Sequence, residues 1–212
     1  MASQTPAVVP PDARREQMLR AAAETIGERG FADTRITDVA RRTGASPALV
    51  IYYFGTKDRL LTEALRWSEN GFYSGVAALL GDLGSARERL EALVRRTCIP
   101  YSGEEGRDGW GLWFDLWAQA LRHPEIAKDR VELDQRWRDT IAGVVREGQR
   151  SGELTADVDA EEFAVTFAAL LDGLSIQVAL LDPVVDPEYA LTIAMRFAST
   201  GLGVDWAPTR SR

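Results

Sequence analysis

Residues 34–61 read TRITDVARRTGASPALVIYYFGTKDRLL, and this stretch decides the fold of the N-terminal third of the chain. Gly44 separates two short apolar patterns, which predict helices over residues 35–43 and 47–53, the first with Thr34 as its N-cap. Ser46-Pro47 starts the second helix, because serine caps a helix N-terminus and proline fits the first helical position. Two short helices joined by a sharp turn and set between longer ones are typical of a helix-turn-helix.

The rest of the chain repeats apolar residues at helical spacing. These patterns run through residues 12–29, 57–80, 85–99, 110–121, 126–147, 163–181 and 191–202. The glycine- and glutamate-bearing stretch 101–109 is expected to form a loop, and Gly148 and Gly152 are expected to end the helix before them. Because no segment shows sustained alternation with period two, the chain is predicted to be all-α.

The composition excludes several classes of catalytic and metal site. The 212 residues include one cysteine and one histidine. A single cysteine excludes an intramolecular disulfide and a cysteine-rich zinc site, and a single histidine makes a histidine-based triad or zinc hydrolase hard to assemble. The acidic residues lack the spacing of a metal-binding loop, and the sequence has no glycine-rich phosphate loop. We therefore predict no metal, no cofactor and no enzymatic activity.

The sequence also bears on cellular location. No apolar run reaches the roughly 18 residues that a membrane span requires. The N-terminus, MASQTPAVVPPD, lacks the basic and long apolar regions of a signal peptide, and its three prolines predict a flexible arm over residues 1–11. A soluble cytoplasmic protein with no membrane partner is predicted.

The formal net charge of −7 averages two unlike parts of the chain. Residues 12–66 hold ten Lys/Arg and eight Asp/Glu, a balance of +2, whereas the remainder holds 15 basic and 24 acidic residues, a balance of −9. A mildly basic N-terminal part on an acidic body permits a nucleic-acid-binding module there without establishing one.

Four segments of this N-terminal part resemble the DNA-binding domain of the TetR family of bacterial transcriptional regulators: Gly30-Phe31, Thr34–Ala40, Gly44–Phe54 and Lys57–Leu61. The resemblance covers about residues 12–65 without a gap. It implies an N-terminal three-helix helix-turn-helix DNA-binding domain, a larger C-terminal helical domain for ligand binding and dimerisation, and a double-stranded DNA operator as partner. Ile51 stands where the family usually has a tyrosine that contacts the DNA backbone, a loss that Tyr52 and Tyr53 could partly cover.

The resemblance also implies which side chains face DNA. The start of the second short helix and Tyr52 point toward base edges, and Lys57 acts as a phosphate clamp, while Arg35 and Arg42 are added because of their charge and location. The predicted DNA-binding residues are Arg35, Thr37, Arg42, Ser46, Pro47, Ala48, Leu49, Tyr52, Tyr53 and Lys57. Val50 and Phe54 are predicted to be core residues. Two alternatives stay open, namely Tyr52 or Tyr53 as packing residues and Arg41 or Arg42 as part of a solvated face.

Members of the family are homodimers, and the resemblance implies that the last two long helices pack with their mates in a four-helix interface. The sequence points the same way, because the helix over 163–181 is apolar on more than one face and must be buried on both sides. The alternative is burial inside a single subunit. The predicted interface residues are Phe163, Phe167, Leu170, Leu174, Val178, Leu181, Leu191 and Met195. Such a dimer would read a palindromic operator.

Aromatic residues concentrate in the middle of the chain. The stretch Gly111–Leu121, with Trp137-Arg138, resembles the C-terminal domain of the betaine/choline-pathway repressor subgroup of the same family, which would favour a quaternary amine, an aldehyde precursor or a polyamine. Aromatic walls with acidic counter-charges would hold a cationic or apolar small molecule, and the alternative is an aromatic-rich seam of the core. The predicted effector-binding residues are Trp67, Trp110, Trp113, Phe114, Trp117 and Asp172.

Together these patterns predict a flexible arm at 1–11, a DNA-binding domain at 12–56, an effector-binding and dimerisation domain at 57–204 and a tail at 205–212. The predicted function is a ligand-responsive transcriptional regulator, a dimeric repressor that a small-molecule effector releases from its operator. Effector binding would swing the long helix over 57–80 and spoil the half-site spacing. The alternative is a helical small-molecule-binding protein or enzyme that uses the helix-turn-helix only as a scaffold.

Overall fold

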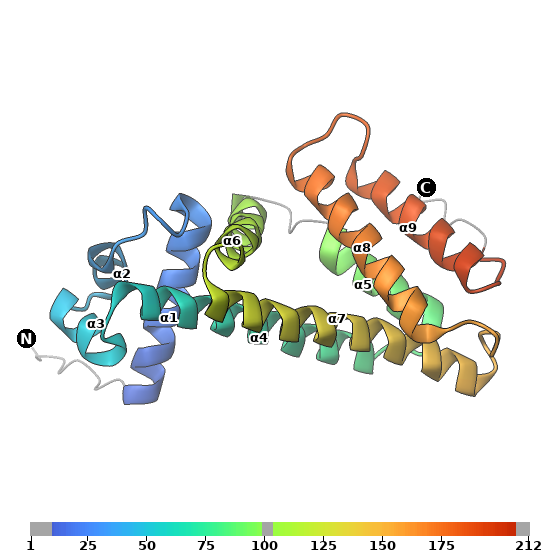
Figure 1. Cartoon of the computed structure of the whole chain (residues 1–212), viewed down its shortest axis with the longest axis horizontal. Coiled ribbons are helices and arrows are strands. Elements are labelled where there is room, and N and C mark those ends of the chain that lie inside the picture. The colour runs from blue at the N-terminus through green and yellow to red at the C-terminus, as the bar shows by residue number, and fades with distance from the viewer. Residues whose placement is uncertain (1–9, 99–103, 207–212) are drawn as a thin grey trace, which may run out of the picture. The chain divides into compact units, whose positions relative to one another are not determined.

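Helices make up every regular element in the part of the chain that the computed structural model describes, residues 10–98 and 104–206 (Figure 1). The all-α prediction is therefore confirmed for these residues. Most of the predicted arm, residues 1–9, and most of the predicted tail, residues 207–212, lie outside the described part. In chain order the helices are α1 (Pro11–Arg29), α2 (Ile36–Thr43), α3 (Pro47–Phe54), α4 (Lys57–Gly81), α5 (Ala86–Cys98), α6 (Glu104–Ala120), α7 (Pro124–Ser151), α8 (Ala160–Ala179) and α9 (Pro187–Gly201).

The chain divides into two compact units. The first comprises residues 1–71 and 108–126, and the second comprises residues 72–107 and 127–212. The predicted boundary at residue 57 falls inside the first unit, because the first part of α4 and most of α6 pack with α1, α2 and α3 around one core. The two compact units of the structure therefore do not coincide with the domains predicted from the sequence.

The first unit is organised around the helix-turn-helix. Helix α2 packs on both α1 and α3, and the core beneath them includes the buried side chains of Met18, Phe54 and Leu116. Gly44 ends α2 with a φ of 62°, in the left-handed region that glycine enters without a steric penalty. The Ser46 hydroxyl then accepts the N–H of Leu49 at 3.1 Å and caps α3, as the sequence predicts.

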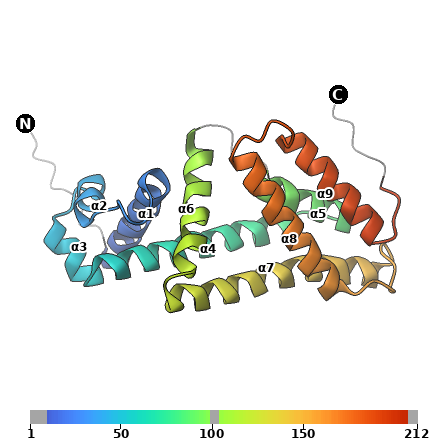
Figure 2. The ribbon, with the colours of Figure 1, turned by 45° about the horizontal axis from the view of Figure 1, so that its top comes forward.

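The second unit is built around α5, α8 and α9, each of which packs on the other two. Helices α8 and α9 run side by side in opposite directions (Figures 1 and 2). Three phenylalanine rings stack between them, with the centroid of Phe163 5.3 Å from that of Phe167 and 6.0 Å from that of Phe197. The apolar residues of α8 that carry the helical period therefore serve the core of this unit.

Helix α8 is, within the described residues, the one helix that is long and apolar enough to cross a membrane, with a mean hydropathy of 1.4. The sequence shows no unbroken apolar run there, because Glu161, Glu162 and Asp172 interrupt it, yet its average is high. Core helices of water-soluble proteins share this property, and 44% of the apolar window is buried against other parts of the chain.

Two local predictions are wrong and a third is right only in part. Thr34 does not cap α2: its hydroxyl donates to the Gly30 carbonyl at 2.8 Å, while Arg35 occupies the N-cap position. Helix α6 begins at Glu104, inside the predicted loop 101–109, because acidic residues at its start favour a helix N-terminus over a loop. Helix α7 continues through Gly148 and ends only before Gly152, since one interior glycine costs a helix about 1 kcal/mol and does not stop it.

Candidate nucleic-acid interface and effector site

The recognition helix α3 divides cleanly into a buried and an exposed side. Val50 and Phe54 are buried in the core of the first unit, as predicted. Tyr52 is 82% exposed and Ile51 is 48% exposed, and Pro47 and Ala48 are exposed at the N-terminal turn. Leu49 and Tyr53 are half-buried against the core, and the Tyr53 ring meets the Tyr52 ring edge-on at 5.7 Å. The packing alternative therefore has support for Tyr53 and none for Tyr52.

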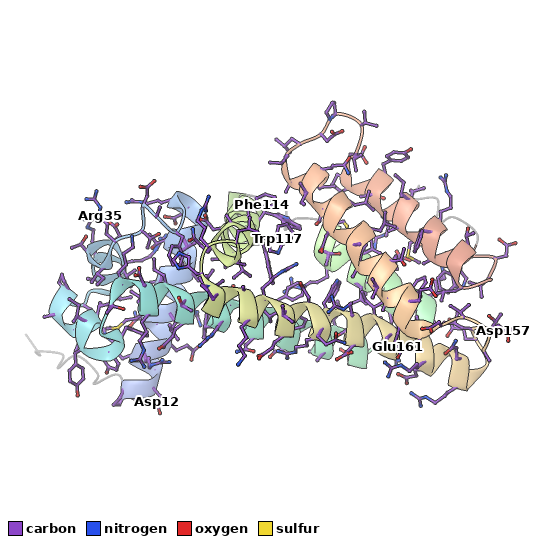
Figure 3. The ribbon with its side chains drawn as sticks, in the orientation of Figure 1. Asp12, Arg35, Phe114, Trp117, Asp157 and Glu161 are labelled. Carbon is purple, nitrogen blue, oxygen red and sulfur yellow. The ribbon has the colours of Figure 1, made fainter. Side chains whose placement is uncertain are left out.

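The two predicted arginines differ in their surroundings. Arg35 is exposed where the chain enters α2 (Figure 3), and Thr37 is exposed one residue into the helix. Arg42 instead faces α1, where its guanidinium lies 3.3 Å from Glu24 and also pairs with Glu28. The hydrogen bond from Arg42 holds the pKa of Glu28 below its ordinary value. Since its charge is already compensated, Arg42 is a weaker candidate for DNA than Arg35.

Lys57 has a contact that sequence reasoning did not foresee. Its Nζ donates to the main-chain carbonyl of Ala32 at 2.8 Å, so the first residue of α4 is tied to the turn between α1 and α2. A lysine ammonium has three N–H donors, and one bond to a carbonyl leaves donors for a DNA phosphate. The contact therefore fixes the lysine in place without excluding the predicted phosphate role.

Other basic residues of the first unit are paired within it. Arg15 pairs with Glu63 and lies 5.2 Å above the Phe54 ring, and Arg59 lies 2.9 Å from the same Glu63. Arg20 lies 5.6 Å above the Trp67 ring. These contacts join α1 to α3 and α4, and the Glu63 carboxylate compensates part of the positive charge of Arg15 and Arg59.

The six predicted effector residues separate into three groups. Trp67 and Trp113 pack against the core of the first unit, which supports the core-seam alternative for both. Trp110, Phe114 and Trp117 form a row of half-buried rings along α6, with centroid separations of 5.9 Å and 6.0 Å between neighbours. Figure 3 shows Phe114 and Trp117 next to each other on that helix.

Asp172, the remaining member, belongs to the second unit. Burial raises the pKa of its carboxyl to about 6, an increase that Arg130 opposes and Asp134 reinforces. Arg130 and Asp134 are themselves paired at 2.8 Å on α7. Within the described residues no group of three His, Cys, Asp or Glu is arranged to hold a metal ion.

Most of the predicted dimer-interface residues are covered within the chain itself, which supports the alternative of burial inside a single subunit for them. Five of the eight are buried in the core of this chain, namely Phe163, Phe167, Leu174, Val178 and Leu191. Leu170 and Met195 are half-buried against the same core, and only Leu181 is largely exposed, at 68%. The helical spacing of apolar residues correctly identified positions that are buried, but the side chains that cover them come mainly from α9 and α5 of the same chain.

A second apolar stripe on α8 points outward and was missed. Val165 and Leu180 are exposed, Ala169 lies between them, and Gly173 and Ile176 are half-buried. Their spacing of three to four residues is visible in the sequence, but the larger residues of the inner face obscured it. This stripe, defined by residues 165, 169, 173, 176 and 180, is the outer face of α8.

Two family models match the chain. Residues 18–64 match bacterial regulatory proteins of the tetR family, and residues 86–203 match the C-terminal domain of BetI-type transcriptional repressors. The second match alone covers more than half of the chain.

Individual relatives align with most of the length of this chain. The HTH-type transcriptional regulator BetI of Stenotrophomonas maltophilia is 30% identical over 182 residues, 85% of this chain and 89% of that protein. BetI of Escherichia coli K12 is 29% identical over 194 residues, 91% of this chain and 95% of that protein. Among solved structures, a transcriptional regulator from Saccharomonospora viridis in complex with choline has a TM-score of 0.79 and 33% identity, covering 89% of this chain and 96% of that chain.

Proposed function

Because this chain belongs to the TetR family of bacterial transcriptional regulators and has a BetI-type C-terminal domain, we propose that it is a cytoplasmic homodimer that represses transcription at a palindromic operator and leaves it when a quaternary ammonium compound binds. The chain is a ligand-responsive transcriptional regulator and not an enzyme. The observation that carries the proposal is the exposed recognition helix of the helix-turn-helix, with Tyr52 82% exposed.

The DNA contacts follow from the exposed side of the helix-turn-helix. Pro47 and Ala48 offer apolar contact to thymine methyl groups but few hydrogen bonds, so phosphate contacts supply much of the affinity and DNA shape much of the specificity. Lys57 and Arg35 supply charge for phosphates, and Tyr52 reaches the groove or the backbone. Arg42 is left out because its ion pairs with α1 would have to break first.

A quaternary ammonium effector suits the row of rings on α6. Such a cation has no N–H to donate, so proteins bind it mainly through aromatic faces and nearby carboxylates. Trp110, Phe114 and Trp117 supply the faces, and their half-buried state leaves ring surface for a ligand. The similar regulator from Saccharomonospora viridis was solved with choline, which is a compound of this class.

The proposed dimer uses the outer face of α8. Val165 and Leu180 are exposed on the side of α8 that faces away from its buried core residues, and Leu181 beside Leu180 is 68% exposed. A row of apolar residues along one exposed side of a helix suits packing against another helix. The small residues Ala169 and Gly173 at the middle of the stripe would allow a second copy of α8 to approach closely.

DNA binding is tested first, with duplexes that the wild-type protein selects from random sequences. Gel shifts with the best duplex are expected to fail for the double variant Lys57→Ala, Tyr52→Ala, because it loses both a phosphate contact and an exposed groove contact. Lys128→Ala is the matched control, since Lys128 is exposed in the second unit. If the wild-type protein selects no sequence at moderate salt, the proposal that the helix-turn-helix reads an operator is wrong.

The effector is tested on the bound complex. Choline is expected to dissociate the wild-type protein from the duplex, whereas 3,3-dimethyl-1-butanol, its neutral isostere, is expected to have little effect because it lacks the charge. Trp117→Leu and Phe114→Leu remove ring faces but keep apolar volume, so they are expected to raise the choline concentration needed for release. Equal effects of choline and the neutral isostere would contradict a cation-binding site.

A further inference from the structure

The turn between α1 and α2 is held from outside by two oppositely charged side chains. The Phe31 N–H donates to Oδ2 of Asp115, on α6, at 2.7 Å. The carbonyl of the next residue, Ala32, accepts from Nζ of Lys57, on α4, at 2.8 Å. Two successive residues of one short turn are therefore fixed by helices that lie far from it in the sequence.

Gly111 brings α6 close enough to α1 for the Asp115 contact. A Cβ atom at Gly111 would lie 2.6 Å from the carbonyl oxygen of Gly27, a separation that real Cβ atoms essentially never show. The backbones of α6 and α1 therefore meet directly, one helical turn before Asp115. Leu112 and Leu116 on the same side of α6 are buried in the core of the first unit.

Helix α6 thus presents two functional faces. One carries Gly111 and Asp115 against α1 and the turn, and the other carries the row of aromatic rings. Asp115 follows Phe114 directly in the sequence, so the carboxylate and the rings belong to one rigid turn of helix. A ligand on the rings that displaces this turn of α6 therefore also displaces the carboxylate.

We propose that Asp115 is the positioning residue through which α6 controls the DNA-binding helices. While its carboxylate accepts the Phe31 N–H, the turn holds α2 in the conformation that binds the operator, and displacement of α6 frees the turn. The inference rests on the proposed function in one respect, namely that the signal is a ligand bound to the aromatic rings of α6. The link between α6 and the DNA-binding helices requires no ligand.

The turn matters for DNA because it leads directly into the predicted contacts. Arg35 and Thr37 follow it at the start of α2, and Lys57 provides both the hold on Ala32 and the predicted phosphate contact. If the turn is free to move, only a fraction of the molecules has these groups in place, and the apparent affinity falls by that fraction. One hydrogen bond to a charged group is strong enough to change such a fraction by about tenfold.

The first test displaces α6 without a ligand. Gly111→Ala puts a methyl group against the Gly27 carbonyl, so we expect about tenfold weaker binding to the selected duplex in fluorescence anisotropy. Gly71→Ala is the matched control, because a Cβ atom there meets nothing within 4 Å. Thermal melts establish that both variants fold. Full affinity in a folded Gly111→Ala protein would overturn the proposal, and if that variant does not fold, the second test decides.

The second test changes the carboxylate itself. Asp115→Ala is expected to bind the duplex about tenfold more weakly and to reduce the factor by which choline weakens binding, because the signal no longer reaches the turn. Asp115→Asn keeps an acceptor for the Phe31 N–H and should restore both quantities. If Asp115 has a merely structural role, Asp115→Ala lowers the melting temperature but leaves unchanged both the duplex affinity and the factor by which choline weakens binding. That result would refute the proposal. If choline does not affect the wild-type protein, the proposed effector is wrong, while the duplex affinities of the variants still decide the role of Asp115.

Discussion

Replacing Asp172 by asparagine should stabilise the protein at neutral pH and do so less in acid. Burial raises the pKa of Asp172 from 3.8 to about 6, so the folded protein holds this proton more tightly than the unfolded chain. The stability that the protonated carboxyl contributes is complete below about pH 4, falls as the pH rises to about 6, and stays lost above that value. Asparagine keeps the shape of the side chain and carries no charge at any of these pH values.

The magnitude follows from the size of the shift. The two pKa values differ by about two units, and each unit corresponds to about 1.4 kcal/mol between the protonation states. Because Asp172 is half-buried and solvent screens part of the effect, about 3 kcal/mol is the upper limit. The difference in unfolding free energy between Asp172→Asn and wild type should therefore grow by about 2–3 kcal/mol between pH 4 and pH 7.

Urea denaturation followed by circular dichroism measures this difference at several pH values. The protein concentration must be the same throughout, because the stability of an oligomer depends on it. Asp157→Asn is the control, since Asp157 is an exposed carboxylate of the same unit (Figure 3). A stability difference that does not change with pH, or one that favours wild type at neutral pH, would refute the assignment of a desolvated carboxyl to Asp172.

Three further outcomes are expected. Arg35→Ala should weaken duplex binding several-fold in gel shifts and reduce the salt dependence of binding by about one phosphate contact. Arg42→Ala should mainly lower the melting temperature in thermal melts, because Arg42 is paired with α1. Ala169→Arg places a charge on the outer face of α8 and should shift the protein toward monomer in light scattering; an unchanged dimer would exclude that face. The Cys98 thiol, whose pKa burial raises to about 11, should react with iodoacetamide only after denaturation; rapid labelling of the native protein would contradict its burial.

The sequence was sufficient for the helix-turn-helix because its determinants are local. Gly44 is required by a left-handed turn, Ser46 caps the next helix through a neighbour three residues on, and the core positions Val50 and Phe54 follow from helical spacing. Each of these depends on residues within one or two turns of helix. The family resemblance over the same segment is confirmed for the same reason.

Contacts between residues that are far apart in the sequence could not be predicted in this way. Periodicity shows that Phe163 and Phe167 must be buried, but it does not say whether Phe197 of the same chain or a second subunit covers them. Arg35 and Arg42 look alike in sequence, and only the approach of α1 shows that the second is paired. The contact between Phe31 and Asp115 spans 84 residues and leaves no periodic pattern.

The internal pairing of arginines in the first unit affects how the protein searches a chromosome. Binding to random DNA is driven by counterions that free cationic side chains displace from the backbone. Arg15, Arg42 and Arg59 already have carboxylate partners, so few cations are left to hold the protein on unrelated sequence. A genome offers on the order of a million or more such decoy sites, and weak attraction to each leaves more of the molecules free in solution. A small number of copies per cell can then keep one target site occupied.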